Sequence, residues 1–374
     1  MVPLDAVRRY EAGGPLVRGG LPRPPLASFG HGAAGVAYFL LRCSVLGDDP
    51  RSLRAAAEWS ARAEADLSHP GAFTGDSPAF PDARASIPAS LYFGEAGIWC
   101  CAALVAAAQA DQVGLDRVLQ RFATVAEACP SDRCDAVSGA AGLLLGVAAM
   151  VEALGDPPPE RLLALGGHLA DRLTRLVAAR DERIPGQLGW LGAAHGWSGI
   201  AQALLRWCQA TATTPGPEVG ALLVSLREAR LANGLWPRHT DSPEVWFGWC
   251  HGSAGWVQLW TLVWEVLGNE DDLVMAERAA VDAVAIEDAG PGLCCGEAGA
   301  AYAALAMYQA TGDDTWLVHA RRLADLAAGE DTGPYFPEHS LWQGDLGVAL
   351  LLAELEQPSS AAMPLYRRSS TRSV

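Results

Sequence analysis

The sequence predicts an all-α protein, an α/α toroid in which seven helix-pair repeats form an inner and an outer ring of helices. Two observations carry this prediction. A Gly-x-x-Gly unit that opens an apolar, alanine-rich stretch occurs seven times, and runs of β-branched residues with the period-two alternation of strands hardly occur. The glycine pairs are Gly32/Gly35, Gly94/Gly97, Gly139/Gly142, Gly196/Gly199, Gly252/Gly255, Gly296/Gly299 and Gly344/Gly347.

Each repeat has room for two helices of different character. The first glycines of successive pairs are 44 to 62 residues apart, which accommodates two helices and two short connections. The stretch after each pair is apolar around most of its circumference, whereas the stretch before it, such as residues 52–67, alternates charged and small apolar residues at helical spacing. Because no polar repeats cap the ends as in an open solenoid, we expect the apolar helices to close on one another inside the amphipathic ones.

One toroid domain is expected over residues 29–356. Residues 1–28 are rich in Pro and Gly and are expected to form an N-terminal extension, and the composition of residues 357–374 predicts a disordered tail. The apolar stretch 136–154 is long enough to span a membrane, but Glu152 interrupts it and similar stretches recur along the chain. We therefore interpret it as a helix buried among other helices, with no membrane span.

Composition excludes several classes of function. Acidic residues number 43 against 27 basic ones, so the net charge is −16, which disfavours nucleic acid and anionic membrane surfaces as partners. All of the basic residues are arginine, which excludes a Schiff-base lysine, a P-loop lysine and a kinase-type lysine. The amino terminus lacks the apolar stretch of a secretory signal, and the nine cysteines are odd in number, so a cytoplasmic protein without a disulfide framework is expected.

The repeat places several cysteines and histidines together. In a toroid the starts of the inner helices converge at one end of the axis, so the two residues before the first glycine of each repeat should face a common opening, here called the mouth. Three of the nine cysteines and three of the eight histidines fall in these positions. The cysteines are Cys250, Cys294 and Cys295, from repeats five and six. Cysteine sulfurs that converging loops bring together are typical ligands of zinc, so these residues predict a metal site.

The remaining cysteines and the first histidine of this set have plainer interpretations. Cys100 and Cys101 lie beyond their glycine pair, inside an apolar stretch, where core packing is expected. Core packing is also expected for Cys43, Cys129, Cys134 and Cys208. His31 has no cysteine beside it, and we expect it to form a structural hydrogen bond.

At these motifs the sequence resembles the lanthionine synthetase C-like family, the lanthipeptide cyclases. The matching elements are GHGAAG, YFGEAG, DAVSGAAG, AAHGWSG, WCHGSAG, LCCGEAG and LWQGDLG, which together span residues 30–347. The resemblance implies an α/α toroid with one catalytic zinc ion held by Cys250, Cys294 and Cys295. It also implies a dehydrated precursor peptide as substrate, whose cysteine thiolate attacks dehydroalanine or dehydrobutyrine to make a (methyl)lanthionine thioether ring. A separate dehydratase or kinase/lyase would have to dehydrate that peptide.

Two departures from the family pattern matter. Most members carry Cys-His-Gly where this chain has Cys294-Cys295-Gly296, so the third ligand would be sulfur instead of nitrogen. Three thiolates around Zn²⁺ leave a net charge of −1, which should make a bound substrate thiolate more nucleophilic. Nisin-type cyclases also carry an arginine four residues before the first ligand, where this chain has Trp246, so the role of that arginine is not carried over.

Three further residues are candidates for roles beside the metal. His195 has the right chemistry to protonate an enolate or to accept a thiol proton. Asp135 matches an acidic residue of the family and would orient that imidazole, or instead cap the following helix. His251 occupies the same register position as Cys295, and a fourth protein ligand there would close the site to substrate. Six tryptophans cluster in the same segments, where they would line a peptide groove or pack in the core: Trp190, Trp197, Trp246, Trp249, Trp256 and Trp342.

Other functions remain in competition with a cyclase. A catalytically silent toroid that binds peptides or serves as a scaffold would need a closed or degenerate metal site. A related zinc enzyme would add glutathione to dehydroamino acids. A carbohydrate-active toroid would need paired carboxylates. The candidates are Glu95 and Glu297, just inside their glycine pairs, but they lie in repeats two and six, too far around the ring to meet.

Overall fold

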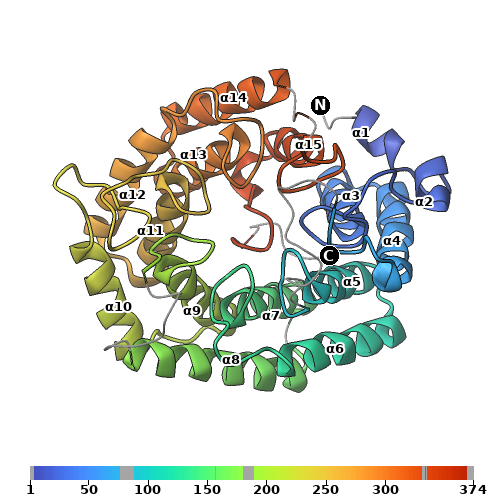
Figure 1. The fold of residues 1–374 in the computed structure, drawn as a ribbon, viewed down its shortest axis with the longest axis horizontal. Coiled ribbons are helices and arrows are strands. Elements are labelled where there is room, and N and C mark those ends of the chain that lie inside the picture. Colours follow the sequence, from blue (N-terminus) through green and yellow to red (C-terminus); the bar gives the residue numbers. More distant parts are fainter. Residues whose placement is uncertain are drawn as a thin grey trace.

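The computed structural model describes residues 4–75, 88–155, 157–179, 189–330, 333 and 335–368. Seven helices in this part of the chain form an inner ring around a central axis (Figure 1). They are α3 (Ala33–Gly47), α5 (Glu95–Ala108), α7 (Ala140–Leu154), α9 (Trp197–Thr211), α11 (Ser253–Leu267), α13 (Glu297–Thr311) and α15 (Asp345–Glu354). Each inner helix contacts the next, and α15 contacts α3. The ring is closed, and the predicted α/α toroid is confirmed.

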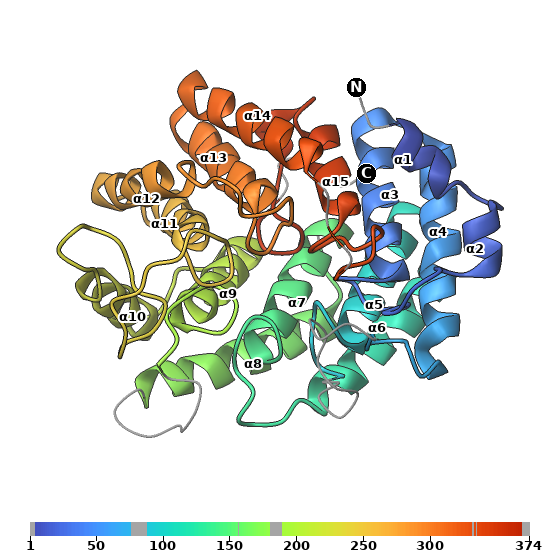
Figure 2. The same ribbon diagram turned by 45° about the horizontal axis from the view of Figure 1, so that its top comes forward.

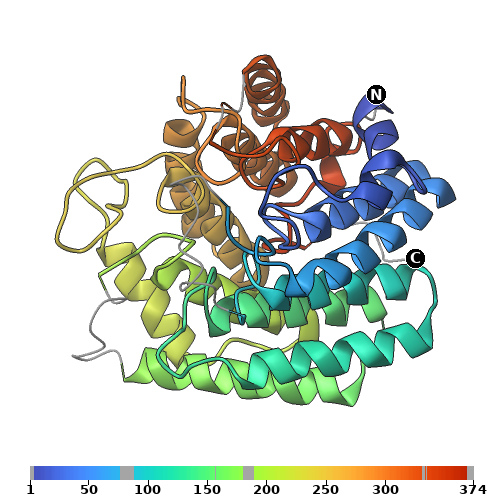
Figure 3. The ribbon, with the colours of Figure 1, turned by 45° about the vertical axis from the view of Figure 1, so that its right-hand side comes forward.

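An outer layer of helices surrounds this ring (Figures 2 and 3). Its long members are α4 (Pro50–Ala65), α6 (Gln112–Glu127), α8 (Glu160–Ala178), α10 (Pro217–Glu228), α12 (Glu270–Ala283) and α14 (Asp314–Gly329). The outer position before α3 is taken by the short α1 (Leu4–Arg9) and α2 (Pro15–Gly19), and α2 contacts α4. Six long outer helices, counted over the described residues, therefore accompany the seven inner ones. Strands are absent from the same residues, which contain only isolated bridges at Trp190–His239 and His239–Ser242.

Burial differs between the two layers as the sequence pattern predicts. In α7 every residue from Ala140 to Ala148 is buried, whereas α8 buries Leu162, Leu165, Leu169 and other residues on one face only. The stretch 136–154 is thus a core helix with its preceding loop. None of the helices in the described ranges is both long enough and apolar enough to cross a membrane.

The paired glycines are required by close backbone approach. The first glycine of each pair is an N-cap with extended backbone, as at Gly139 (φ −145°), which any residue can adopt. A Cβ on Gly139 would, however, lie 2.4 Å from the backbone carbon of Arg133, and a Cβ on Gly97 would lie 1.9 Å from the carbonyl oxygen of Leu91. Each loop folds tightly over the first turn of its helix, and only glycine leaves room for it.

A circle of backbone hydrogen bonds joins the loops at the mouth. In six of the seven repeats, the residue two positions before the first glycine donates its N–H to the carbonyl of the equivalent residue in the next repeat. The bonds run from Gly30 to Tyr92 (2.6 Å), Val137 to Ala194 (3.2 Å), Ala194 to Cys250 (2.8 Å), Cys250 to Cys294 (3.2 Å), Cys294 to Trp342 (3.2 Å) and Trp342 to Gly30 (2.9 Å). We call each junction between neighbouring repeats a seam. At the seventh seam, between repeats two and three, the hydroxyl of Ser90 donates to the carbonyl of Val137 (2.6 Å). These bonds fix the loops that carry the candidate site relative to one another.

The prediction of a disordered tail at residues 357–374 is wrong for its first part. The short 3₁₀ helix η3 (Pro358–Ser360) is followed by residues 361–367, all of which are buried, and the chain there runs inside the ring (Figure 1). Met363, Leu365 and Tyr366 are too few to establish a helical or strand period, so the space inside the ring, and not a pattern of their own, determines their burial. Residues 369–374 lie outside the described residues.

Candidate metal centre at the mouth of the ring

The three cysteines predicted as metal ligands come together at the mouth. Cys250 lies in the loop before α11, and Cys294 and Cys295 lie in the loop before α13. The Sγ atom of Cys295 is 3.3 Å from that of Cys250 and 3.4 Å from that of Cys294. All three sulfurs lie within 4.8 Å of one another, and no other group of three potential ligands occurs among the residues that the structure describes.

A glycine that the repeat pattern did not single out allows the two loops to approach. Gly248 lies four residues before the first glycine of its pair, and a Cβ there would be 2.6 Å from Cα of Cys295. The backbone N–H of Cys250 donates to the carbonyl of Cys294 at 3.2 Å in the same place. Gly192 and Gly292 hold the equivalent position in the neighbouring repeats and lie equally close to the next loop. These glycines are a sequence signal for the seams of the site.

The sulfur geometry fits a zinc ion. Sulfur atoms around a tetrahedral zinc with Zn–S bonds of about 2.3 Å lie about 3.8 Å apart, close to the separations of 3.3 and 3.4 Å found here. The thiols of Cys250 and Cys294 lie beside Cys295 and lower the pKa of its thiol, while those of Cys250 and Cys295 raise the pKa of Cys294. Without a cation the three groups cannot all ionise, so the cluster is suited to a divalent ion that binds three thiolates.

His251 lies beside the cysteines but outside their cluster. Its ring packs against Trp190 at a centroid distance of 4.6 Å and against His195 at 5.6 Å. Burial, with the nearby charge of His195, lowers the pKa of His251 to about 4. The group of potential ligands within 4.8 Å contains the three cysteines and not His251.

The structure brings His195 and Asp135 together across the seam between repeats three and four. Nδ1 of His195 lies 3.5 Å from Oδ2 of Asp135, and the His195 side chain is 43% exposed whereas that of Asp135 is 5% exposed. Asp135 also accepts hydrogen bonds from the backbone N–H groups of Val137 (2.8 Å) and Ser138 (2.6 Å) and from the Ser138 hydroxyl (2.8 Å). Asp135 thus faces the imidazole and closes its own loop. The alternative that it caps the following helix is wrong, because the N-cap of α7 is Gly139 and receives no side-chain hydrogen bond.

The net effect of this environment is to favour the ionised carboxylate of Asp135. Burial alone would raise the pKa of the Asp135 carboxyl, but hydrogen bonding and charge from His195, with hydrogen bonds from Ser138, outweigh burial and lower it. A buried carboxylate therefore faces a half-exposed imidazole at the mouth.

His31 occupies the equivalent position in the first repeat, and its predicted hydrogen bond is confirmed. Nδ1 of His31 lies 2.8 Å from the hydroxyl oxygen of Ser340, and its ring stacks on Phe93 at 5.0 Å. Burial lowers the pKa of His31 to about 3, so the ring is neutral. His31 therefore helps to join the last repeat to the first and does not take part in proton transfer.

The six tryptophans divide between core and mouth. Trp197, Trp249, Trp256 and Trp342 are buried, whereas Trp190 and Trp246 are partly exposed. Arg238, which the sequence analysis missed, lies over both of these rings at 5.7 and 4.8 Å and pairs with Glu244 at 2.9 Å. No spacing in the sequence signals this contact, because Arg238 comes from the long connection before α11. The aromatic and basic wall so formed flanks His251.

The structure also tests the expected burial of the other cysteines and the pairing of Glu95 with Glu297. Cys43, Cys100, Cys101, Cys129 and Cys134 are buried as expected, while Cys208 is only half-buried. Glu297 is fully buried, and its Oε1 accepts the backbone N–H of Ala289 at 2.9 Å. That carboxylate has a structural partner, which further weakens the alternative of a carbohydrate-active pair.

Comparison with known proteins identifies the family. The family model described as "Lanthionine synthetase C-like protein" matches residues 26–367. The chain belongs to this family. Among solved structures it is similar to nisin cyclase, with a TM-score of 0.67 and 16% sequence identity over 88% of each chain, which supports the shared toroid fold. A Danio rerio protein described as "Glutathione S-transferase LANCL1" is 30% identical over 190 residues, which are 47% of this chain and 45% of that protein. The chain thus spans less than half the length of that relative.

Proposed function

We propose that this chain is a zinc-dependent lanthionine cyclase that adds peptide cysteine thiols to dehydroalanine or dehydrobutyrine and so forms (methyl)lanthionine rings. The observation that carries the proposal is the cluster of Cys250, Cys294 and Cys295 within 4.8 Å at the mouth, in a member of the lanthionine synthetase C-like family. The family match and the toroid fold shared with nisin cyclase support a cyclase-type enzyme.

The three cysteines would hold the metal and leave one side open. Zinc bound by three protein ligands supplies a coordination position at which a substrate thiol ionises near neutral pH. Because Cys250 is buried and the loops are bonded to each other through the circle of backbone hydrogen bonds, the protein fixes the three sulfurs before substrate arrives. A substrate thiol would approach that position from the mouth.

His195 would handle the proton of the addition. In the reaction the thiol loses its proton, a carbon–sulfur bond forms at the β-carbon, and the electrons of the double bond move to the α-carbon and its carbonyl. That enolate needs a proton at the α-carbon. His195 is exposed enough to reach substrate, and the Asp135 carboxylate at 3.5 Å would orient its ring.

The substrate and setting follow from this chemistry. The substrate would be a dehydrated precursor peptide, and dehydration would fall to a separate dehydratase or kinase/lyase, because the chain contains no lysine that could serve a kinase. We expect the reaction in the cytoplasm, with neither nucleic acid nor a membrane as partner.

A second candidate function is addition of glutathione to dehydroamino acids. The observation that favours it is the resemblance to the Danio rerio protein described as a glutathione S-transferase, over 190 residues. Both reactions would use the same metal and the same proton donor. They differ in whether the thiol belongs to the acceptor peptide or to a second molecule.

A mass-spectrometric assay separates these functions. The zinc-loaded protein is incubated with a dehydrated peptide that carries one free cysteine, with and without glutathione, and free thiols are then alkylated. A cyclase gives a product of unchanged mass that resists alkylation, whereas a glutathione transferase gives adducts. Single Cys→Ser changes at positions 250, 294 and 295 should abolish activity, and Cys208→Ser, at a half-buried cysteine of α9, is the matched control. If a protein that binds zinc forms neither product, this result would instead support a catalytically silent toroid.

A further inference from the structure

The segment of residues 358–367, here called the axial segment, crosses the interior of the ring. Its backbone carbonyls accept hydrogen bonds from Gln309 of α13 at Pro358 and Ala361, both at 2.8 Å. Further along, the carbonyl of Tyr366 accepts from Gln202 of α9 at 3.2 Å. The segment is therefore tied to two inner helices, α13 and α9, which lie on either side of α11 in the ring.

Arg367 anchors the far end of the axial segment to α11. Its Nη1 donates to the carbonyl of Gln258 and to the hydroxyl of Thr261, both at 3.1 Å, and its Nη2 lies 2.5 Å from Oε1 of Glu265. Thr261 and Glu265 lie in the second half of α11, remote from the mouth at its start. The anchor therefore comes from the end of the ring opposite the metal centre.

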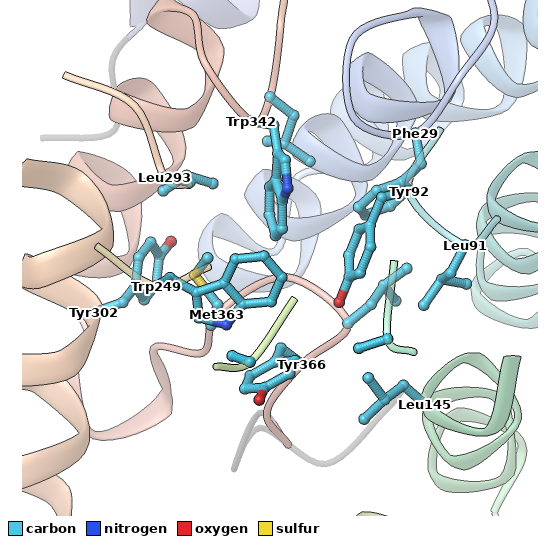
Figure 4. Close-up of a cluster of buried hydrophobic side chains, with 14 of the residues drawn as sticks. Phe29, Leu91, Tyr92, Leu145, Trp249, Leu293, Tyr302, Trp342, Met363 and Tyr366 are labelled. Atoms are coloured by element: carbon cyan, nitrogen blue, oxygen red, sulfur yellow. The ribbon is translucent and has the colours of Figure 1, made fainter. Parts of the chain in front are cut away.

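Tyr366 reaches from this anchor toward the loops at the mouth. Its side chain is fully buried, and its ring packs edge-on against Trp249, with centroids 5.1 Å apart and an interplanar angle of 90°. Trp249 packs in turn against Trp342 at 5.2 Å, and Trp342 stacks on Tyr92 at 4.7 Å. Figure 4 shows these four rings converging within the ring of helices, with Tyr366 at their base. We call them the aromatic floor.

The aromatic floor is joined to both ligand loops. Trp249 is the residue directly before Cys250. The backbone carbonyl of Trp342 accepts the N–H groups of Leu293 (2.9 Å) and Cys294 (3.2 Å). Within the part of the chain that the structure describes, the buried indole nitrogens of Trp249 and Trp342 have no hydrogen-bond partner. Ring packing, with no side-chain hydrogen bond, therefore fixes the orientation of these two side chains.

We propose that Tyr366 is a positioning residue for the metal centre, which it reaches through Trp249. Removing the Tyr366 ring would leave an empty space below Trp249, and the indole would shift into it because no hydrogen bond restrains it. The backbone of Trp249 continues into Cys250, so this shift changes the separation of the three sulfurs. The inference rests on the metal centre in the proposed function, and it makes the carboxyl-terminal part of the chain a component of the site.

The test compares Tyr366→Ala with Tyr10→Ala. Tyr10 is a matched control, because it is also buried and packs edge-on against one tryptophan, Trp59, at 5.7 Å, but on the outer helix α4. Zinc affinity is measured by competition with a chromogenic chelator, the Co²⁺ protein is examined by visible absorption, and thermal unfolding is followed in parallel. We expect both variants to lose thermal stability, and Tyr366→Ala alone to bind zinc about tenfold more weakly with an altered Co²⁺ spectrum. Tyr366→Phe, which keeps the ring, should restore both.

The outcomes separate the inference from the proposed function. Equal zinc affinity in Tyr366→Ala and Tyr10→Ala, at similar loss of thermal stability, would overturn the positioning role while leaving the metal centre intact. A wild-type protein that binds no zinc would overturn the proposed function itself. Should Tyr366→Ala fail to fold, Tyr366→Leu retains most of the volume without the edge-on contact and is measured instead, with the same criteria.

Discussion

Nδ1 of His195 faces Oδ2 of Asp135 at 3.5 Å, and Nδ1 of His31 faces the hydroxyl of Ser340 at 2.8 Å in the same register, at another seam of the ring. In both pairs the residue before the first glycine of one repeat meets the residue four positions before the first glycine of the preceding repeat. The scaffold is the same, but one partner is a carboxylate beside a half-exposed ring and the other is a hydroxyl beside a buried one. Chemistry at the mouth therefore depends on which side chains occupy equivalent places.

Substitution of His195 should separate proton transfer from metal binding. His195→Asn should keep the fold and the zinc, since the three sulfurs are unchanged, while ring formation falls by roughly 10²–10⁴-fold through loss of general acid–base catalysis. Asp135→Asn should give a smaller loss, because the amide keeps an oxygen for the backbone N–H groups of Val137 and Ser138 but loses the charge. Single-turnover thioether formation, read by alkylation and mass, measures both. If His195→Asn forms rings at the wild-type rate, His195 has no catalytic role and the metal alone accounts for catalysis.

Replacement of His251 should leave the metal in place. The ring of His251 lies against Trp190 and His195 and outside the sulfur cluster, so His251→Ala should retain about one zinc per chain. The Co²⁺ form of both proteins should show three sulfur ligands and a fourth, exchangeable one, and its spectrum should change on addition of a thiol substrate. A spectrum that does not respond to thiol would indicate a closed structural site.

Addition of a single methyl group at Gly248 should disturb the metal centre. A Cβ there would lie 2.6 Å from Cα of Cys295, so the two ligand loops must move apart in Gly248→Ala. We expect a clear fall in zinc occupancy together with a lower thermal midpoint. The control is Gly220→Ala on α10, where a Cβ meets nothing within 4 Å, and where alanine should stabilise the helix by about 0.5–1 kcal/mol. Unchanged zinc occupancy in Gly248→Ala would show that the loops do not need this close approach.

The buried imidazole of His31 should make the fold sensitive to acid. Burial lowers its pKa to about 3 in the folded protein, whereas a histidine in the unfolded chain has a pKa of about 6.5. Between these values the unfolded state binds the extra proton, so stability falls as the pH drops below about 6.5, by about 1.4 kcal/mol per pH unit for one group.

Urea unfolding at several pH values between 7 and 4.5 measures this effect. The dependence of the unfolding free energy on pH should be shallower in His31→Gln by about one proton, whatever the change in stability at pH 7. His168→Gln on α8, at an exposed histidine, should keep the wild-type slope. Identical slopes in all three proteins would contradict a neutral, buried His31.

The sequence predicted those features that its repeat encodes. The register of the glycine pairs placed Cys250, Cys294 and Cys295 together, because equivalent positions in a ring converge at one end. The pairing of His195 with Asp135 was instead an implication of the family resemblance. Features with no periodicity could not be found in this way. Met363, Leu365 and Tyr366 form an apolar segment too short to establish a period, and their burial depends on the interior of a ring that seven distant segments create. Arg238 likewise meets Trp246 only because a long connection folds back over the mouth.

The hydrogen bond from Trp342 to Gly30 has a consequence for how such a chain can evolve. An open solenoid has two free ends and can lengthen by duplicating a repeat, because each new unit needs to fit one neighbour only. Here the last repeat already has the first one as its neighbour. An eighth unit would open this seam and change the angle at every other one, so that gain or loss of a single helix pair is not a small step. Variation among such proteins should therefore collect in the connections between helices, such as the one that carries Arg238, while the number of repeats stays constant.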